Sequence, residues 1–594
     1  MDMQKSGGEK MPENNSTNGL RRGESHVEAM RNAISGSILN VEWQTQDQVT
    51  VTVPTDKLPE CMEFMYYERG GWLPDMVVAD ERQLNGHFAL YYLLSMEDRE
   101  GKFTENDKCY LTIRTTVDPV TKEFPSVTPR VPACVWSERE AYDMMGLKAV
   151  GLPDARRLVL PDDWPDNLHP LLKDGMDYRH RPAPVCDVEN YEFLDESGVE
   201  DPTEISMGPM HITSDEPGHF RLFCEGEDIV DADYRLFYAH RGMEKVAEAR
   251  MTYDQIPFLA DRICGICGFA HSVAYVQTVE NAIGLEIPKR AEYLRGIFLE
   301  VERLHSHLLN LGLVCHYCGF DTGFMHFFRI REKAMDLAQL LTGTRKTYGM
   351  NLIGGVRRDI LDDHRKETLR LVGELRDDAA RLVDILTSTG NFESRVAGVG
   401  ILDRKVCRDF SPVGPMVRGS DYARDVRFDH PYSGYKYLEG FEAQTASSCD
   451  VLGRTSVRIA EFMDSIAMIE QWINNLPQGP ILTEDFKYEP HKFAMGFTEA
   501  PRGEDMHWTM TGDNLKVYRW RAKAATYSNW PVLRYALQGN TVSDAAVIIG
   551  SMDPCYSCTD RVTICDVKTH KEKTITKQQL EDYAATRKHS PLKD

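Results

Sequence analysis

An α+β module over residues 36–180, followed by a larger and mainly α-helical module over residues 186–561, is the architecture that this sequence indicates. Short runs of β-branched and aromatic residues, bounded by turn residues, crowd the first part of the chain. From about residue 290 onward, apolar residues recur at helical spacing instead. With 594 residues, of which 42% are hydrophobic, the chain has room for more than one core.

The first module is expected to be rich in strands. Residues 1–35 are polar and lack periodicity, so we expect a disordered tail before it. Gln48–Val53 alternates with period two, and His87–Leu94 and Cys109–Val117 are β-branched or aromatic runs, which predicts three strands. The Pro-rich stretch Arg181–Val185 predicts a linker to the second module.

In the second module, apolar side chains recur at spacings of three and four, as the buried face of a helix requires. The pattern runs from Leu294 to Leu311 and again from Leu369 to Leu386. No internal repeat and no Gly-rich nucleotide fingerprint accompanies it. We therefore expect long helices in this part of the chain.

The charge balance narrows the class of partner. Acidic residues outnumber basic ones, 92 against 69, and the net charge of −23 argues against a nucleic-acid partner. No apolar run approaches the roughly 20 residues that span a bilayer, and the first residues lack the apolar stretch of a signal peptide. A cytoplasmic chain is expected, and attachment to a membrane through a partner is compatible with this.

Two Cys-x-x-Cys pairs, Cys264 with Cys267 and Cys555 with Cys558, are the strongest chemical signal in the sequence. A domain-sized segment separates them, so they meet only if the chain folds back on itself. Four thiolates then form a cage for a soft metal, because a thiolate rather than a thiol is the metal ligand. Spacing alone leaves structural zinc, a redox or other metal, and unrelated core thiols open.

The other cysteines carry a weaker signal. A third pair, Cys315 and Cys318, ends an apolar helical run, and we expect buried structural thiols there. The remaining cysteines show no clustering and are expected to be structural: Cys61, Cys109, Cys134, Cys186, Cys224, Cys407, Cys449 and Cys565.

The sequences around the two main pairs narrow the interpretation. Arg262-Ile-Cys-Gly-Ile-Cys-Gly-Phe-Ala-His271 and Asp553-Pro-Cys-Tyr-Ser-Cys558 resemble the two signatures of nickel–iron hydrogenase large subunits. Further segments resemble the membrane-associated, complex I-related branch of that family, in its hydrogenase-3 and hydrogenase-4 types: Gly208–His219, His240–Glu244, Glu302–His307, Asn351–Arg357 and Glu499–Gly503. Ser137–Gly146 and Pro153–Trp164 resemble the 30-kDa, C-type subunit of complex I, so the chain resembles a C-type module fused to a D-type module.

The resemblance implies a specific metal centre. All four cysteines would bind nickel, and Cys267 and Cys558 would also bridge to an iron that carries carbon monoxide and cyanide. Cys264 and Cys555 would be terminal nickel ligands. Because the chain has no ferredoxin-like run of cysteines, a [4Fe–4S] cluster would come from a partner small subunit.

Four further residues acquire roles by the same resemblance. Arg502 would place a guanidinium over the open coordination site, where a fixed cation polarises hydrogen; an ordinary surface arginine is the alternative. Glu216 would relay the proton, with a solvated loop carboxylate as the alternative. His271 would hydrogen-bond a ligand sulfur, and Asp553 would hold Arg502 or the backbone of the second cysteine loop.

Two implied features concern magnesium and the C-terminus. Glu244 resembles a magnesium-binding glutamate, but Arg561 stands where other hydrogenases supply a histidine, so the magnesium site is doubtful. In the family, an endopeptidase removes the C-terminal tail after metal insertion, which implies a cut between Arg561 and Val562. The alternative for residues 562–594 is a permanent segment with an exposed helix at Lys577–Lys588.

The function implied is that of a catalytic hydrogenase subunit which reversibly reduces protons to hydrogen, within a formate hydrogenlyase complex at the cytoplasmic face of the inner membrane. Implied partners are the [4Fe–4S] small subunit, ferredoxin-like electron-transfer subunits, membrane subunits, a formate dehydrogenase, and nickel–iron maturation factors. One rival is a quinone-interacting C/D-type scaffold of a complex I-like NADH dehydrogenase, a family that lacks the four cysteines. A zinc scaffold is the second rival.

Overall fold

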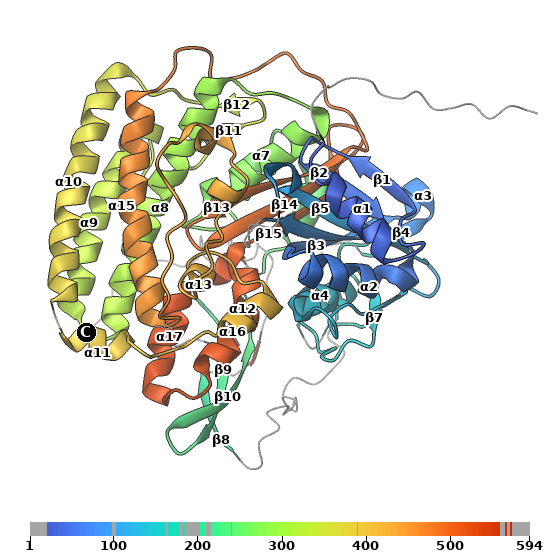
Figure 1. Cartoon of the computed structure of the whole chain (residues 1–594), viewed down its shortest axis with the longest axis horizontal. Helices are drawn as coiled ribbons and strands as arrows, with labels where there is room; N and C mark the ends of the chain where they lie inside the picture. Colours follow the sequence, from blue (N-terminus) through green and yellow to red (C-terminus); the bar gives the residue numbers. More distant parts are fainter. Residues whose placement is uncertain are drawn as a thin grey trace, which may run out of the picture.

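The computed structural model describes residues 21–97, 103–161, 164–176, 182–183, 202–209, 216–238, 240–388, 390–558, 565–566 and 571–572. Within these ranges a three-stranded sheet lies between the N-terminal module and a group of long helices (Figure 1). The expected linker lies outside the described residues except for positions 182–183.

The N-terminal module is built on a five-stranded sheet in the order β1-β2-β5-β4-β3. Its strands are β1 Asn40–Trp43, β2 Gln48–Thr52, β3 Trp72–Glu81, β4 His87–Met96 and β5 Cys109–Val117. β2 pairs with β5 in parallel, and the other pairs are antiparallel. The three strands expected from alternating and β-branched residues are therefore present, as β2, β4 and β5.

The expected tail is wrong for part of its length, because Glu24–Ala33 forms helix α1. His26, Val27 and Met30 are buried, so one face of the helix packs on the module while its other face stays polar. Two apolar residues on an otherwise charged helix give a weak periodic signal, and the segment therefore resembled a disordered tail. Residues 1–20 lie outside the description.

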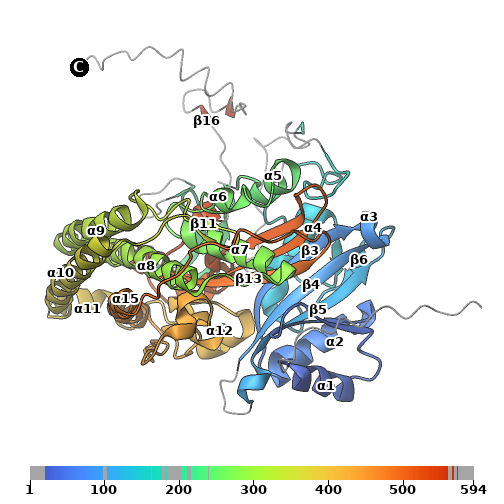
Figure 2. The same ribbon diagram turned by 90° about the horizontal axis from the view of Figure 1, so that it is seen from above.

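The second module is dominated by long helices, as expected. They are α7 Gly268–Ile283, α8 Lys289–Tyr317, α9 Asp321–Thr342, α10 Asp362–Thr387 and α15 Val451–Asn474. α8 is buried along most of its length between α9 and α15, and α10 packs on α9 and α15. Seen from above, α9, α10 and α15 gather at one end and the strands of the N-terminal module at the other, with α7 between them (Figure 2).

A three-stranded antiparallel sheet joins the two modules: β13 Phe493–Ala500, β14 Gly503–Thr511 and β15 Val517–Lys523. Helix α7 packs on it from the helical side. From the other side, the Gln48 side chain exchanges two hydrogen bonds of 3.1 Å with the backbone of Met495, and Arg521 pairs with Asp75 at 2.9 Å. The sheet therefore connects the N-terminal module to the helical body.

A second small sheet has the order β10-β9-β8, with β8 Thr203–Met207, β9 His219–Glu225 and β10 Asp228–Arg235. Shorter elements complete the fold: α2 Leu58–Glu63, α3 Arg82–Asn85, β6 Glu123–Pro125, α4 Val135–Met145, β7 Lys148–Val150, α5 Met243–Arg250, α6 Ile256–Ala260, β11 Asn351–Leu352, β12 Gly355–Val356, α11 Gly390–Val396, α12 Arg404–Phe410, α13 Pro415–Arg418, α14 Val426–Asp429, α16 Ala525–Leu537, α17 Ala545–Met552, β16 Cys565–Asp566 and β17 Lys571–Glu572.

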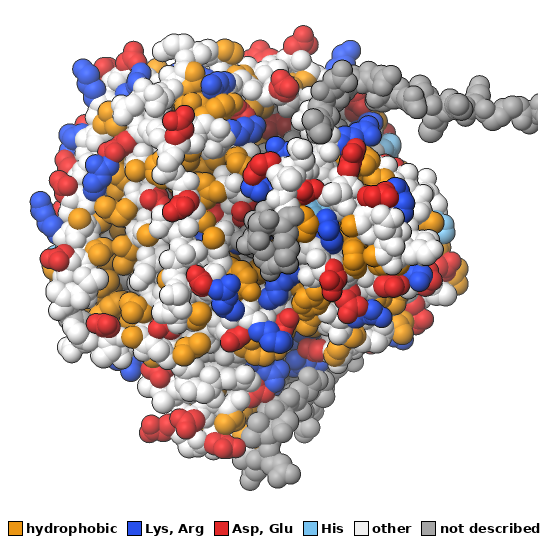
Figure 3. All heavy atoms as spheres, in the orientation of Figure 1, with side chains coloured by type: hydrophobic (Ala, Val, Ile, Leu, Met, Phe, Trp, Pro, Cys, Tyr) orange, Lys and Arg blue, Asp and Glu red, His pale blue; other side chains and the backbone are white. Residues whose placement is uncertain are grey.

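The surface carries charged side chains of both signs. Acidic and basic side chains are interspersed over the face shown in Figure 3. Among the described helices, none is both long enough and apolar enough to cross a bilayer.

Candidate metal centre

Three of the four expected cysteines, Cys264, Cys267 and Cys555, come together at the N-terminal end of α7. Cys264 and Cys267 lie in the loop between α6 and α7, and Cys267 is the residue before the first turn of α7. Cys555 follows α17. The sulfur atoms of Cys264, Cys267 and Cys555 all lie within 4.8 Å of one another, and those of Cys264 and Cys555 are 3.2 Å apart. The side chain of Cys558 lies outside the description.

This arrangement suits a soft metal ion. Each of the three thiols is at most 4% exposed, so the donor set is shielded from water. The backbone N–H groups of Ile266 and Cys267 donate to the sulfur of Cys264 at 3.2 and 3.3 Å, which favours a thiolate there. Converging thiolates are ligands for nickel, iron–sulfur clusters or zinc rather than for hard cations.

Arg502 lies at the tip of a tight hairpin beside these thiols. Ala500 of β13 pairs with Gly503 of β14, so Pro501 and Arg502 form the turn. Gly503 has a φ of 127°, and a Cβ there would lie 2.6 Å from the backbone nitrogen of Gly414, so only glycine fits. The hairpin thereby projects the Arg502 side chain into the protein, where it is 3% exposed.

Three hydrogen bonds hold the Arg502 guanidinium. Its Nε donates to the backbone oxygen of Asp553 at 2.8 Å, Nη2 to Oδ1 of the same residue at 2.7 Å, and Nη1 to Oγ of Ser306 at 3.2 Å. Burial opposes the charged form, but Asp553 and the nearby thiols of Cys555, Cys267 and Cys264 outweigh it and hold the pKa of Arg502 well above its usual range. The structure thus shows Asp553 holding Arg502, and it adds Ser306, which the sequence did not indicate.

Glu216 lies three residues before β9 and contacts the loop that carries the second cysteine pair. Its carboxylate accepts hydrogen bonds from the backbone N–H of Ser557, at 2.7 Å, and from the Ser557 hydroxyl, so it binds the second cysteine loop directly. Burial raises the pKa of Glu216, and the proximity of Cys264 acts in the same direction while Arg502 opposes it. A carboxyl group with a raised pKa holds a proton more readily near neutral pH.

His271 lies one helical turn after Cys267. One of its ring nitrogens lies within 4.8 Å of the Cys267 sulfur and of a carboxylate oxygen of Asp505. Its Nδ1 is 3.1 Å from Nε2 of His507. Burial lowers the pKa of His271 to about 4, so the ring is neutral at physiological pH. Asp505 and His507 alternate on β14, a period-two signal that escaped notice because the region was expected to be helical.

Two further residues that the sequence did not single out hold the cysteine loops. Glu302 on α8 accepts from the backbone N–H groups of Phe269 and Ala270 at 2.8 and 3.0 Å, at the start of α7. Burial raises the pKa of Glu302 to about 8. Arg241 donates to the backbone oxygens of Arg262 at 2.9 Å and of Ser557 at 3.0 Å, which links the two cysteine loops.

The expected magnesium-related role of Glu244 does not fit its surroundings. Its carboxylate pairs with Arg519 at 2.7 Å and with Arg521 at 3.5 Å, and it accepts from the backbone N–H of Ala522 at 3.2 Å. Two guanidinium groups occupy the place that a cation would take.

The remaining candidates lie elsewhere. Cys315 is buried on α8, and neither it nor Cys318 belongs to a potential metal-binding cluster among the described residues. The expected cleavage site, Arg561 and Val562, lies outside the described residues.

Comparison with protein families matches three models to the chain. The respiratory-chain NADH dehydrogenase 30 Kd subunit matches residues 51–179, and the 49 Kd subunit of the same enzyme matches residues 318–496 and 488–561. The nickel-dependent hydrogenase model matches residues 241–316, which include Cys264 and Cys267.

Individual relatives agree with these models. Formate hydrogenlyase subunit 5 of Escherichia coli K12 is 58% identical over 571 residues, which is 96% of this chain and 99% of the relative. Hydrogenase-4 component G of the same organism is also 58% identical, over 96% of this chain and 99% of the relative. A chain in the solved structure of an archaeal membrane-bound sulfane sulfur reductase is 29% identical, with a TM-score of 0.58, and covers 61% of this chain and 99% of that one.

Proposed function

Because the chain belongs to the family of nickel–iron hydrogenase large subunits that includes formate hydrogenlyase subunit 5 and hydrogenase-4 component G, we propose that it reversibly reduces protons to dihydrogen within a formate hydrogenlyase-type complex. The observation that carries the proposal is the convergence of three buried thiols beside the fixed cation of Arg502. A complex I-like scaffold has the same two modules, but a scaffold role does not account for three buried thiols beside Arg502.

The family's cofactor is a nickel–iron centre. We infer that Cys264, Cys267, Cys555 and Cys558 would hold it, that Cys267 and Cys558 would be ligands to both metals, and that the iron would carry carbon monoxide and cyanide. When bound, the centre supplies the place where protons and electrons combine. The buried sulfur donors of the three described cysteines support this inference, since soft ligands suit nickel.

In this proposal Arg502 supplies a fixed positive charge. Asp553 and Ser306 hold its guanidinium in one orientation, so no reorganisation is needed during the reaction. Its high pKa keeps it protonated, so it stabilises charge without itself exchanging the proton. Because the group is buried, water screens its field weakly.

Glu216 is the proposed proton carrier. Burial raises its pKa toward the range in which a carboxyl group both accepts and releases a proton. Its two contacts with Ser557 fix the carboxylate against the second cysteine loop. A proton taken up there can pass along the Ser557 hydroxyl, which is both a donor and an acceptor. The neutral ring of His271 tunes the basicity of the Cys267 sulfur in this scheme.

The electron path requires other subunits. We infer a small subunit with a [4Fe–4S] cluster, ferredoxin-like electron-transfer subunits, membrane subunits and a formate dehydrogenase, which would hold the chain at the cytoplasmic face of the inner membrane. The similarity to a formate hydrogenlyase subunit and to a chain of a membrane-bound reductase supports an assembly of this kind.

We also infer a maturation pathway for this chain. Nickel–iron maturation factors would load the centre, and an endopeptidase would then cut between Arg561 and Val562. The segment 562–594 carries several lysines in an acidic chain, which suits a temporary contact with the body before the cut. Mass spectrometry of the active complex should find a chain that ends at Arg561; a chain that still ends at Asp594 would contradict the cut.

Metal analysis of the purified complex tests the proposed function. We expect nickel and iron in the large subunit, and infrared bands from diatomic ligands on iron. Cys264→Ser and Cys555→Ser should each lose the nickel, the infrared bands and hydrogen production together. The control Cys315→Ser, which lies outside the thiol cluster, should keep all three properties. Zinc without nickel in an active complex would overturn the proposal.

A further inference from the structure

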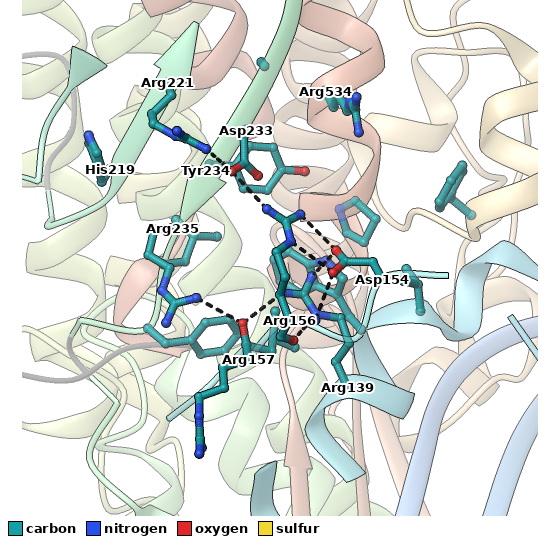
Figure 4. Close-up of a pocket in the computed structure, with 18 of the residues that line it drawn as sticks. Arg139, Asp154, Arg156, Arg157, His219, Arg221, Asp233, Tyr234, Arg235 and Arg534 are labelled. Carbon is teal, nitrogen blue, oxygen red and sulfur yellow. Dashed lines mark hydrogen bonds and ion pairs between the residues drawn. The ribbon is translucent and has the colours of Figure 1, made fainter. Parts of the chain in front are cut away.

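A cavity of about 430 Å³ lies where the N-terminal module meets β9, β10 and α16. Its lining includes none of the cysteines of the metal centre. Six arginines from both modules surround it (Figure 4): Arg139, Arg156, Arg157, Arg221, Arg235 and Arg534. So many guanidinium groups around one cavity are unexpected in a chain whose net charge is −23.

The lining contains two carboxylates beside these six guanidinium groups, Asp154 and Asp233, and acids outside the lining pair with other arginines: Asp143 and Asp166 with Arg157, Glu204 with Arg221, and Asp231 with Arg534. Asp154 is shared by Arg139 at 3.0 Å and Arg156 at 2.9 Å. Asp233 is shared by Arg156 at 3.2 Å and Arg221 at 3.0 Å. Guanidinium groups thus outnumber carboxylates among the side chains that line the cavity, and the acids outside the lining compensate part of their charge.

The cations are held in place rather than extended into solvent. Arg139 donates from Nε to the backbone oxygen of Arg156 at 2.8 Å and from Nη2 to that of Arg157 at 2.9 Å. Arg235 donates to the same oxygen of Arg157 at 3.0 Å. Burial lowers the pKa of Arg139, and the neighbouring charges of Arg156 and Arg235 add to this effect although Asp154 opposes it. The guanidinium groups of Arg139 and Arg235 are therefore held in fixed positions at the cavity.

Aromatic rings form another part of the lining. Trp136 on α4 lies with its ring centroid 5.8 Å from that of Phe237 and 6.4 Å from that of Tyr234. The hydroxyl of Tyr234 donates to the backbone oxygen of Trp530, so its polar end is already occupied. The cavity thus combines a cationic wall with an apolar one, and its volume is typical of sites for small molecules.

We propose that this cavity binds a small phosphorylated ligand, with the phosphoryl oxygens at the arginines and the rest of the ligand against Trp136 and Phe237. A phosphoryl group offers three acceptor oxygens, so it can engage several guanidinium forks at once. Inorganic pyrophosphate and a nucleotide share this chemistry, and only the nucleotide uses the aromatic wall as well.

Calorimetric titration of the purified complex with ATP and, separately, with pyrophosphate at constant ionic strength tests the proposal. We expect one site per large subunit. If ATP binds at least tenfold more tightly than pyrophosphate, the aromatic wall takes part and the ligand is a nucleotide; equal affinities identify an inorganic anion. Either result supports the site.

Variants locate the binding. Arg534 is 44% exposed on its side chain, so Arg534→Gln should fold, and it should weaken binding by roughly tenfold. Arg221→Gln should do the same, and Arg534→Lys should recover part of the loss by keeping the charge. The matched control is Arg370→Gln on α10, an exposed arginine paired with Glu367, which should bind as the wild type does.

Three outcomes would overturn the proposal. One is that neither probe binds to the complex, including the case in which the isolated chain binds them because a partner subunit fills the cavity in the complex. Another is unchanged affinity in both Arg221→Gln and Arg534→Gln. The third is an equal loss in Arg370→Gln, which would mean diffuse attraction of anions rather than a site.

Discussion

Single side chains at the metal centre act through fixed geometry. The guanidinium of Arg502 makes three hydrogen bonds, two to Asp553 and one to Ser306. Glu216 is similarly fixed by two contacts with Ser557. A substitution at Arg502 can therefore keep the positive charge and change only its orientation. A substitution at Glu216 can keep a hydrogen-bond acceptor and remove only the ability to carry a proton.

Arg502→Lys separates charge from orientation. The lysine keeps a positive charge, but an ammonium cannot reproduce the planar fork that binds Asp553 at two points. We expect wild-type nickel content and a loss of hydrogen production of at least about a hundredfold, the size typical of removing one preorganised donor. Nickel analysis and a hydrogen assay on the same preparation measure both. Turnover near the wild-type level in Arg502→Lys would show that charge alone suffices.

Glu216→Gln separates proton transfer from hydrogen bonding. Glutamine still accepts a hydrogen bond through its side-chain oxygen, but it cannot carry a proton. We expect nickel to be retained while both hydrogen production and hydrogen–deuterium exchange are lost. Glu216→Asp, which keeps a carboxyl group on a shorter side chain, is the control and should recover part of the exchange. Full exchange in the glutamine variant would remove Glu216 from the proton path.

Among helices and strands, the sequence predicted best where one pattern dominated. The alternation at Gln48–Val53 and the helical spacing from Leu294 to Leu311 identified β2 and α8. The sheet of β13 to β15 was missed because the whole region after residue 290 was expected to be helical, although polar and apolar residues alternate along β14 and β15. The cysteine pairs and Arg502 were predictable from local motifs, whereas Ser306, Asp505 and Arg241 reach the centre through long-range folding alone.

Helix α1 is a further element that the sequence did not predict, and its docking should depend on pH. Burial, with Arg69 adding to it, lowers the pKa of His26 from 6.5 to about 4. When α1 detaches, His26 binds a proton more readily, so docking is fully stable above pH 6.5 and weakens as the pH falls toward 4. The effect amounts to at most about 3 kcal/mol. Hydrogen exchange of Glu24–Ala33 should therefore be faster at pH 5 than at pH 7, after correction for the intrinsic rate.

His26→Gln provides the control for that measurement. Glutamine does not titrate in this range, so the excess exchange of α1 at pH 5 over pH 7 should disappear in the variant. Equal pH sensitivity in the variant and the wild type would mean that another group controls the docking of α1.

Across the whole molecule, the two modules share one core. A single cluster of buried apolar residues extends from Val27 in the N-terminal module to Tyr556 beside the metal centre. Polar contacts reinforce it: Tyr110 donates to Glu504 at 2.7 Å, and Glu504 lies two residues after Arg502. The N-terminal module therefore supports the hairpin that carries Arg502. Loss of contact between the modules should weaken nickel binding at the metal centre.

Asp75→Asn tests this coupling. Asp75 and Arg521 form a buried ion pair of 2.9 Å between β3 and β15, and removal of one charge leaves Arg521 with only part of its compensation, from Glu140 and Glu244. Breaking a buried pair costs about 3 kcal/mol. Because the core is continuous, we expect the complex to lose secondary structure and nickel in one transition on heating, and Asp75→Asn should lower the midpoint of both signals equally.

The control is Glu367→Gln, which removes an exposed partner of Arg370 on α10 and should leave both midpoints in place. Two separate transitions, with only the first displaced by Asp75→Asn, would show instead that the N-terminal module unfolds independently and leaves the metal centre intact.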